Sequence, residues 1–111
     1  MNNFRTHLCN QLTDNDKGHV VKLCGWVHRK RDHGNLLFID LRDNYGIAQC
    51  VIESNSEIFP EIESLPPESV IAIEGTVVER SEETINDSIE TGRFEVSIIS
   101  FQVLSKSNEL P

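Results

Sequence analysis

Side chains that could bind a nucleic acid gather in the first half of the chain. Three consecutive basic residues, Arg29, Lys30 and Arg31, can attract phosphate groups, although a solvated loop has the same composition. Phe38 supplies an aromatic ring on which a base can stack, and Gln49 supplies an amide that can read a base edge. These residue types favour binding over catalysis.

Residues suited to catalysis or metal binding are present but wrongly spaced. The chain has no nucleophile elbow, phosphate-binding glycine loop or HExxH motif. Cys24 and His28 would lie roughly 13 Å apart on a strand that rises about 3.3 Å per residue, too far to share one zinc ion. Asp40 and Asp43 flank a turn, where carboxylates have local roles. We therefore predict no catalytic residues and no metal site.

The net charge of −8 argues at first against a nucleic-acid partner, but the charge is unevenly distributed. Residues 1–52 hold seven Lys and Arg against five Asp and Glu, whereas residues 53–111 hold three against thirteen. Charges about 10 Å apart are largely screened from each other in physiological salt. A basic patch on this acidic body can therefore still attract RNA.

Length and composition bound the class of protein. The 111 residues suffice for one domain, and no apolar stretch is long enough to cross a bilayer. The first residues lack the apolar core of a secretory signal. Three cysteines without CxxC spacing favour free thiols in a reducing compartment. We expect a cytoplasmic protein without membrane contact.

Apolar residues alternate with a period of two, which predicts strands. The predicted strands are 20–29, 36–42, 47–53, 69–80 and 93–104. Gly25 and Gly75 fall in the buried register, as expected at the sharp bends of a small barrel. The apolar register of the last strand changes near Ile98, which predicts a bulge.

A short helix is predicted between the third and fourth strands, where Ile58, Ile62 and Leu65 form an apolar stripe behind Pro60. Five strands with a helix at this point indicate an all-β protein, a five-stranded OB-fold Greek-key barrel. We predict an OB-fold domain over 1–104 and the start of a linker over 105–111. Polar loops at 30–35 and 81–92 fall where OB-folds bind oligonucleotides.

Strand alternation places some side chains on the outer face. Leu37, Ile39 and Leu41 would point into the barrel, so Phe38 would point outward, either to stack a base or to cover a neighbouring side chain. The same rule turns Gln49 and Glu95 outward, where both could equally be ordinary surface residues. The residues alone leave these alternatives open.

Several ordered motifs resemble the N-terminal domain of bacterial aspartyl-tRNA synthetases. They include Leu23 to Gly34 (LCGWVHRKRDHG), Phe38 to Asp43 (FIDLRD) and Thr91 to Val96 (TGRFEV). The similarity covers nearly the whole chain and is most specific between Gly25 and Asp43. It implies that the chain reads the anticodon loop of tRNA(Asp).

The resemblance also implies roles for individual residues. Phe38 would stack on the central anticodon uracil, Gln49 and Arg31 would contact the same site, and Glu95 would recognise the first base, guanine or its queuine derivative. Glu82 and Thr84 would lie in the loop over the third base, although this loop lacks the family's usual Asn-Pro pattern. The residues that we predict to bind RNA are Arg29, Lys30, Arg31, His33, Phe38, Gln49, Arg80, Glu82, Thr84 and Glu95.

The resemblance further implies partners and cofactors for a longer parent enzyme, an aspartate–tRNA ligase. That parent would be a homodimer that uses ATP and Mg²⁺, whereas no cofactor is expected on this chain. His33 resembles the relaxed type of enzyme that also charges tRNA(Asn), which makes tRNA(Asn) a second hypothetical partner. The alternatives are a generic single-strand-binding or protein-docking OB module and a purely structural barrel.

Overall fold

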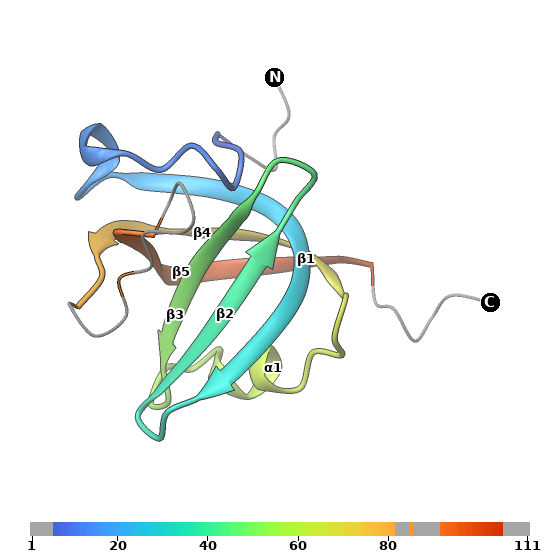
Figure 1. Ribbon diagram of the computed structural model, residues 1–111. Coiled ribbons are helices and arrows are strands. Elements are labelled where there is room, and N and C mark those ends of the chain that lie inside the picture. Colours follow the sequence, from blue (N-terminus) through green and yellow to red (C-terminus); the bar gives the residue numbers. More distant parts are fainter. Residues whose placement is uncertain (1–5, 82–84, 86–91, 106–111) are drawn as a thin grey trace.

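A computed structural model describes residues 6–81, 85 and 92–105, and these residues form a closed five-stranded barrel (Figure 1). A short helix, α1 (Phe59–Glu63), and a 3-10 helix, η1 (Asp14–Asp16), accompany the strands. The strands are β1 (Val20–Asp32), β2 (Leu36–Arg42), β3 (Ile47–Glu53), β4 (Val70–Glu79) and β5 (Phe94–Ser105). The all-β architecture and the order of elements predicted from the sequence are confirmed.

The strands pair in the order β1-β2-β3-β5-β4, and β4 closes the barrel against β1. All pairs are antiparallel except β3 and β5, which run parallel. Figure 1 shows β1 as a long curved strand that passes across the barrel. Its first half pairs with β4 and its second half with β2, so one strand belongs to both sides of the barrel.

Two glycines allow strands to approach closely at the bends. A Cβ atom on Gly25 would lie 2.3 Å from the carbonyl oxygen of Arg42, and one on Gly75 would lie 2.3 Å from that of Ser97. Real Cβ atoms do not come so close to backbone, so any side chain at either position would push two strands apart. The prediction of bends at these glycines agrees with this packing.

The core lies inside the barrel and is closed at one end by α1 (Figure 1). Pro60 occupies the first turn of α1, where its missing N–H costs no hydrogen bond. Ile62 and Leu65 are buried against the barrel, and Ile58 packs beside them. The apolar stripe predicted for this segment is therefore confirmed.

Register shifts occur in both long strands. In β5 the partners change between Glu74 and Gly75 of β4, which leaves Ile99 as the extra residue and confirms the bulge predicted near Ile98. In β1 the shift lies between Val27 and Arg29. The strand continues beyond it to Asp32, so the prediction of a loop beginning at residue 30 was wrong. Residues 30–32 are polar and show no apolar alternation, so nothing in the sequence indicated a strand there. They are held in the sheet by backbone pairing with β2.

All three cysteines are free thiols, with Cys9 and Cys50 buried and Cys24 partly buried. Burial raises the pKa of the Cys9 and Cys50 thiols, so both remain protonated at neutral pH. None of the helices in the described ranges is long and apolar enough to cross a membrane.

Candidate nucleic-acid interface

The predicted interface forms two cross-strand rows on the outer face of β1, β2, β3 and β5. Residues directly opposite each other in a sheet share a face. The first row, in register order, is Arg29, Asp40, Gln49 and Glu95. The second row is Arg31, Phe38 and Val51. Backbone pairing alone thus brings together five of the ten residues that the sequence singled out.

The bulge in β1 determines which residues reach this face. Val27 points into the core opposite Leu41, so an uninterrupted strand would also turn Arg29 and Arg31 inward. The extra residue at position 28 moves Arg29 opposite Asp40 instead. Both arginines therefore join the outer rows, and Lys30 between them takes the inward direction.

A chain of hydrogen bonds connects the two rows. Nη2 of Arg31 donates to Oδ1 of Asp40 at 2.9 Å and to Oε1 of Gln49 at 2.7 Å. Nε2 of Gln49 donates to Oε1 of Glu95 at 2.8 Å. Gln49 is only 1% exposed, although its strand direction is outward as predicted. The sequence analysis missed Asp40, which alternation places on the same face as Phe38.

Phe38 lies outside the barrel core but its ring is only 6% exposed. The guanidinium carbon of Arg31 lies 5.5 Å from the ring centroid. The His33 ring packs edge-on, with centroids 5.1 Å apart and an interplanar angle of 82°. Of the two alternatives left open by the sequence, packing against neighbouring side chains describes the free chain. Stacking on a base stays a prediction.

Arg80 follows β4 and is buried beside the first row. Its Nε donates to the carbonyl oxygen of Phe94 at 2.8 Å. Burial lowers the pKa of Arg80 from its usual value, while the charges of Glu95 and Asp40 act in the opposite direction. Only 7% of Arg80 is exposed, so its positive charge acts on Glu95 and Asp40 with little screening by solvent.

Lys30 points away from its basic neighbours. Its Nζ donates to the carbonyl oxygens of Glu63 and Leu65, both at 2.6 Å, where α1 ends. Burial lowers the pKa of Lys30, and the nearby Glu63 partly offsets this effect. Arg29, by contrast, is exposed. The structure therefore separates the predicted basic triplet. Alternation alone would have turned Lys30 outward, and the bulge at residue 28 reverses that direction.

Of the remaining predicted residues, His33 lies next to the second row. His33 is exposed in the turn between β1 and β2, and its backbone N–H donates to the carbonyl oxygen of Leu36. Glu82 and Thr84 fall outside the described residues. A hollow of about 370 Å³ adjoins the first row and is lined by Asp14, Glu79, Arg80, Ile85, Arg93 and Phe94.

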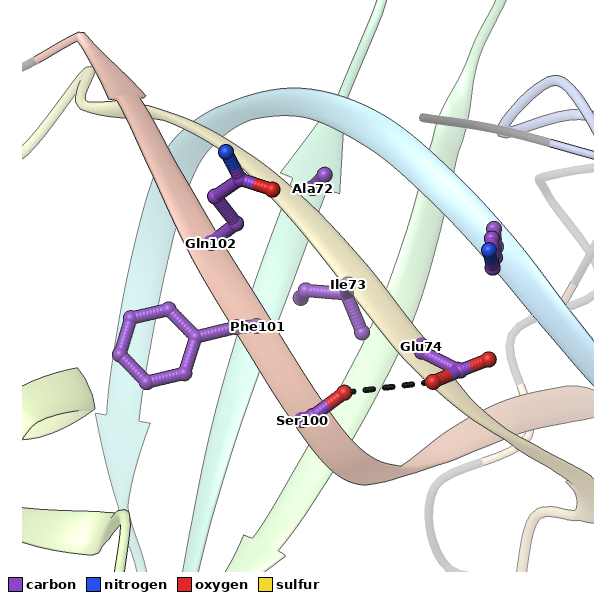
Figure 2. Close-up of a pocket in the computed structure, with 7 residues that line it drawn as sticks. Ala72, Ile73, Glu74, Ser100, Phe101 and Gln102 are labelled. Atoms are coloured by element: carbon purple, nitrogen blue, oxygen red, sulfur yellow. Dashed lines mark hydrogen bonds between the residues drawn. The ribbon is translucent and has the colours of Figure 1, made fainter. Parts of the chain in front are cut away.

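Another hollow, of about 190 Å³, lies over β1, β4 and β5 and contains none of the predicted binding residues (Figure 2). Ala72 leaves space there between longer side chains, and Ser100 donates to Glu74 at 3.4 Å. These partners are ordinary strand contacts, and they favour no particular ligand.

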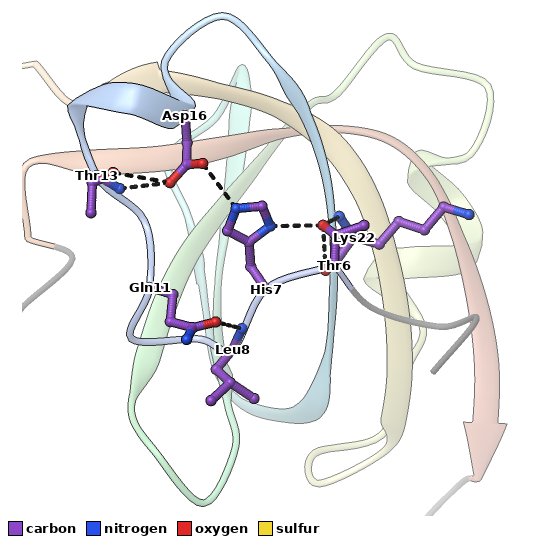
Figure 3. Close-up of polar contacts among 7 residues, drawn as sticks. All are labelled: Thr6, His7, Leu8, Gln11, Thr13, Asp16 and Lys22. Carbon is purple, nitrogen blue, oxygen red and sulfur yellow. Dashed lines mark hydrogen bonds and ion pairs between the residues drawn. The ribbon is translucent and has the colours of Figure 1, made fainter. Parts of the chain in front are cut away.

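A polar cluster near the beginning of the chain has the residue types of a catalytic triad (Figure 3). His7 contacts Oγ1 of Thr6 at 2.7 Å and Oδ1 of Asp16 at 2.8 Å. The Thr6 hydroxyl, however, accepts the backbone N–H of Lys22 at 2.9 Å. This cluster therefore holds the first segment against β1. Within the described ranges, no three His, Cys, Asp or Glu side chains are grouped to hold a metal ion.

The interface can recognise a base by its edge. After its two contacts, the Gln49 amide retains capacity for one further bond at each end. Glu95 can only accept hydrogen bonds when ionised, which suits a base edge that carries N–H donors, as guanine does. Phe38 lies in the second row on the same outer face, with its ring next to Arg31, which binds the amide. Amide, carboxylate and ring together match the requirements of single-stranded RNA recognition.

The fold agrees with comparisons to known proteins. The profile of the OB-fold nucleic acid binding domain family matches residues 21–104. The chain belongs to this family. The OB domain is 55% identical over 111 residues to the aspartate–tRNA(Asp/Asn) ligase of Pelagibacter ubique, and it spans 19% of that protein.

Further relatives of the OB domain are also tRNA ligases. It is 50% identical to the aspartate–tRNA(Asp/Asn) ligase of Paramagnetospirillum magneticum, over its full length and 13% of that protein. The asparaginyl-tRNA synthetase of Pyrococcus horikoshii superposes with a TM-score of 0.75 at 28% identity, over 95% of this chain and 24% of that one. The resemblance to aspartyl-tRNA synthetases is thereby confirmed.

Replacing Phe38 tests whether the covered ring contributes to stability. We expect Phe38→Ala to lower the free energy of unfolding by about 3–5 kcal/mol, because a buried aromatic side chain is lost. Phe38→Leu retains apolar volume and should cost less than half as much. Urea unfolding of both variants measures the difference, and a loss below about 1 kcal/mol for Phe38→Ala would show that the ring is exposed in solution.

The two basic neighbours in β1 should behave differently. Arg29→Gln should reduce the slope of log affinity against log salt concentration by about 1, the contribution of one phosphate contact. It should leave the free energy of unfolding nearly unchanged. Lys30→Gln should leave the salt dependence unchanged but lower the free energy of unfolding by about 1–2 kcal/mol, since two carbonyls lose a charged donor. Salt titrations and urea unfolding measure these effects. An equal change in salt dependence for both variants would assign Lys30 to phosphate.

Proposed function

We propose that this OB domain reads the anticodon loop of tRNA(Asp) as part of an aspartate–tRNA ligase. The observation that carries the proposal is the chain of hydrogen bonds from Arg31 through Gln49 to Glu95, which joins the two outer rows next to the Arg31–Phe38 pair. In this proposal the RNA displaces part of the cover on Phe38 and stacks its central uracil there. The names of the two ligases that share half or more of the sequence support the same assignment.

A generic single-strand-binding module would require a different surface. Such modules combine a basic groove with stacking platforms and few fixed base-edge contacts. Here the outer rows hold two carboxylates, Asp40 and Glu95, and an amide whose orientation is fixed by its neighbours. Carboxylates repel the phosphate backbone and add to RNA binding only where they accept hydrogen bonds from a base edge. The surface therefore favours base recognition over sequence-tolerant binding.

The activity of the parent enzyme is also a proposal, since the chain spans only 13–19% of the two relatives named above. We propose that residues 1–104 form the anticodon-binding domain and that 105–111 begin a linker to a catalytic domain. That domain would activate aspartate with ATP and Mg²⁺ in a cytoplasmic homodimer. The OB domain would contribute affinity and selection of the tRNA.

Binding to anticodon stem-loops tests the proposed function directly. The chain should bind a tRNA(Asp) stem-loop about tenfold or more tightly than the same stem-loop with its central uracil replaced, which corresponds to about 1–3 kcal/mol for one misread base. Fluorescence anisotropy at fixed salt measures both dissociation constants. Equal binding to the two RNAs would support the sequence-tolerant alternative.

Selection between tRNA(Asp) and tRNA(Asn) depends on the third anticodon base, which is C in the first and U in the second. We propose that the parent enzyme accepts both, because His33 resembles the relaxed type of enzyme and the names of both relatives include tRNA(Asp/Asn). The expected result is affinities within about threefold for stem-loops that differ only at this base, since little free energy separates them. A strong preference for C would reject the dual specificity.

A further inference from the structure

We propose that Asp40 is a positioning residue of this interface: it fixes Arg31 and, through Arg31, the orientation of the Gln49 amide that reads a base. The inference rests on the proposed function and adds to it a residue that does not itself touch RNA. It can fail while anticodon reading stands, because Asp40 could merely stabilise the barrel.

The position of Asp40 separates it from the neighbouring acidic residue. Asp40 lies within β2, opposite Arg29 of β1 and Gln49 of β3. Its side chain is 20% exposed and accepts from Arg31. Asp43, by contrast, accepts backbone N–H groups of Cys9, Tyr45 and Gly46 and so holds the turn after β2. Of these two carboxylates, only Asp40 lies in the first row.

One nitrogen of Arg31 carries both contacts. Nη2 has two hydrogens, and it donates one to Asp40 and one to Gln49. The buried Nε of Arg31 has no hydrogen-bond partner among the described residues. The guanidinium is therefore held at one end, and the carboxylate of Asp40 provides its charged anchor. Charge-assisted hydrogen bonds of this kind are roughly twice as strong as neutral ones.

The anchored guanidinium gives the amide of Gln49 a single orientation. Oε1 faces the donor of Arg31, and Nε2 faces the carboxylate of Glu95. A flipped amide would set NH₂ against the guanidinium and oxygen against the carboxylate, two repulsive contacts at once. A base therefore meets a fixed order of acceptor and donor. When Arg31 is free to leave, this order depends on the contact with Glu95 alone.

The sign of the effect distinguishes positioning from phosphate binding. Asp40→Asn removes a negative charge from the interface, so non-specific attraction of RNA should stay equal or rise. Reading of the central base should worsen, because the neutral amide anchors Arg31 weakly and the Gln49 amide is then oriented by Glu95 alone. We therefore expect the affinity for the tRNA(Asp) stem-loop to fall relative to that for the mismatched stem-loop, while the affinity for the mismatched stem-loop itself does not fall.

The experiment compares Asp40→Asn with Glu74→Gln in the full chain. Glu74 is a partly buried strand carboxylate on another face, where it accepts from Ser100. The preference for the central uracil should fall about fivefold or more in Asp40→Asn and remain unchanged in Glu74→Gln. In a Gln49→Leu background, Asp40→Asn should cause no further fall. If Asp40→Asn gives no cooperative transition in urea and is therefore not folded, Asp40→Ser is used in its place.

Nuclear magnetic resonance of the free chain supplies a readout that needs no RNA. In the wild type the two side-chain amide protons of Gln49 should have chemical shifts displaced from those of a free glutamine, and in Asp40→Asn both should move towards the free-glutamine values. Unchanged amide signals, unchanged discrimination, or a further fall in the Gln49→Leu background would each overturn the positioning role. A wild type that cannot discriminate stem-loops would overturn the proposed function, and the amide signals would still decide whether Asp40 orients Gln49.

Discussion

The interface depends on one extra residue in β1. The register shift between Val27 and Arg29 lets the same strand fill the core with its first half and present basic side chains outside with its second. Without it, strand alternation would place two guanidinium groups in the barrel, where burial of unpaired charge is prohibitive. Core packing and RNA recognition are thus separated by a local irregularity of the backbone.

The contacts made by Arg31 show why the free interface is closed. Its guanidinium contacts a carboxylate and an amide through one nitrogen and lies near an aromatic ring. Each group that we propose to read a base therefore already has a partner in the free chain, and in this proposal RNA binding exchanges contacts more than it adds them. Such exchange favours specificity, because a wrong base leaves buried polar groups without partners.

Much of the fold could be predicted from the sequence, and the arrangement of the interface only in part. Alternation located the strands and the outward direction of Phe38, because the period of two survives wherever one face is buried. It could not show that Phe38 is covered, since the cover comes from residues brought near by pairing. Lys30 and Asp40 were misjudged for the same reason, as their partners Glu63 and Arg31 are set by tertiary structure.

The parallel pairing of β3 with β5 has a consequence for the order of assembly during synthesis on the ribosome. Strands β1, β2 and β3 are neighbours in sequence and can form a meander that already contains Phe38, Asp40 and Gln49. Glu95 joins Gln49 only when β5 docks, and β5 is the last of the five barrel strands to leave the exit tunnel. Since distant pairings form slowly, a nascent chain holds an incomplete interface until the barrel closes.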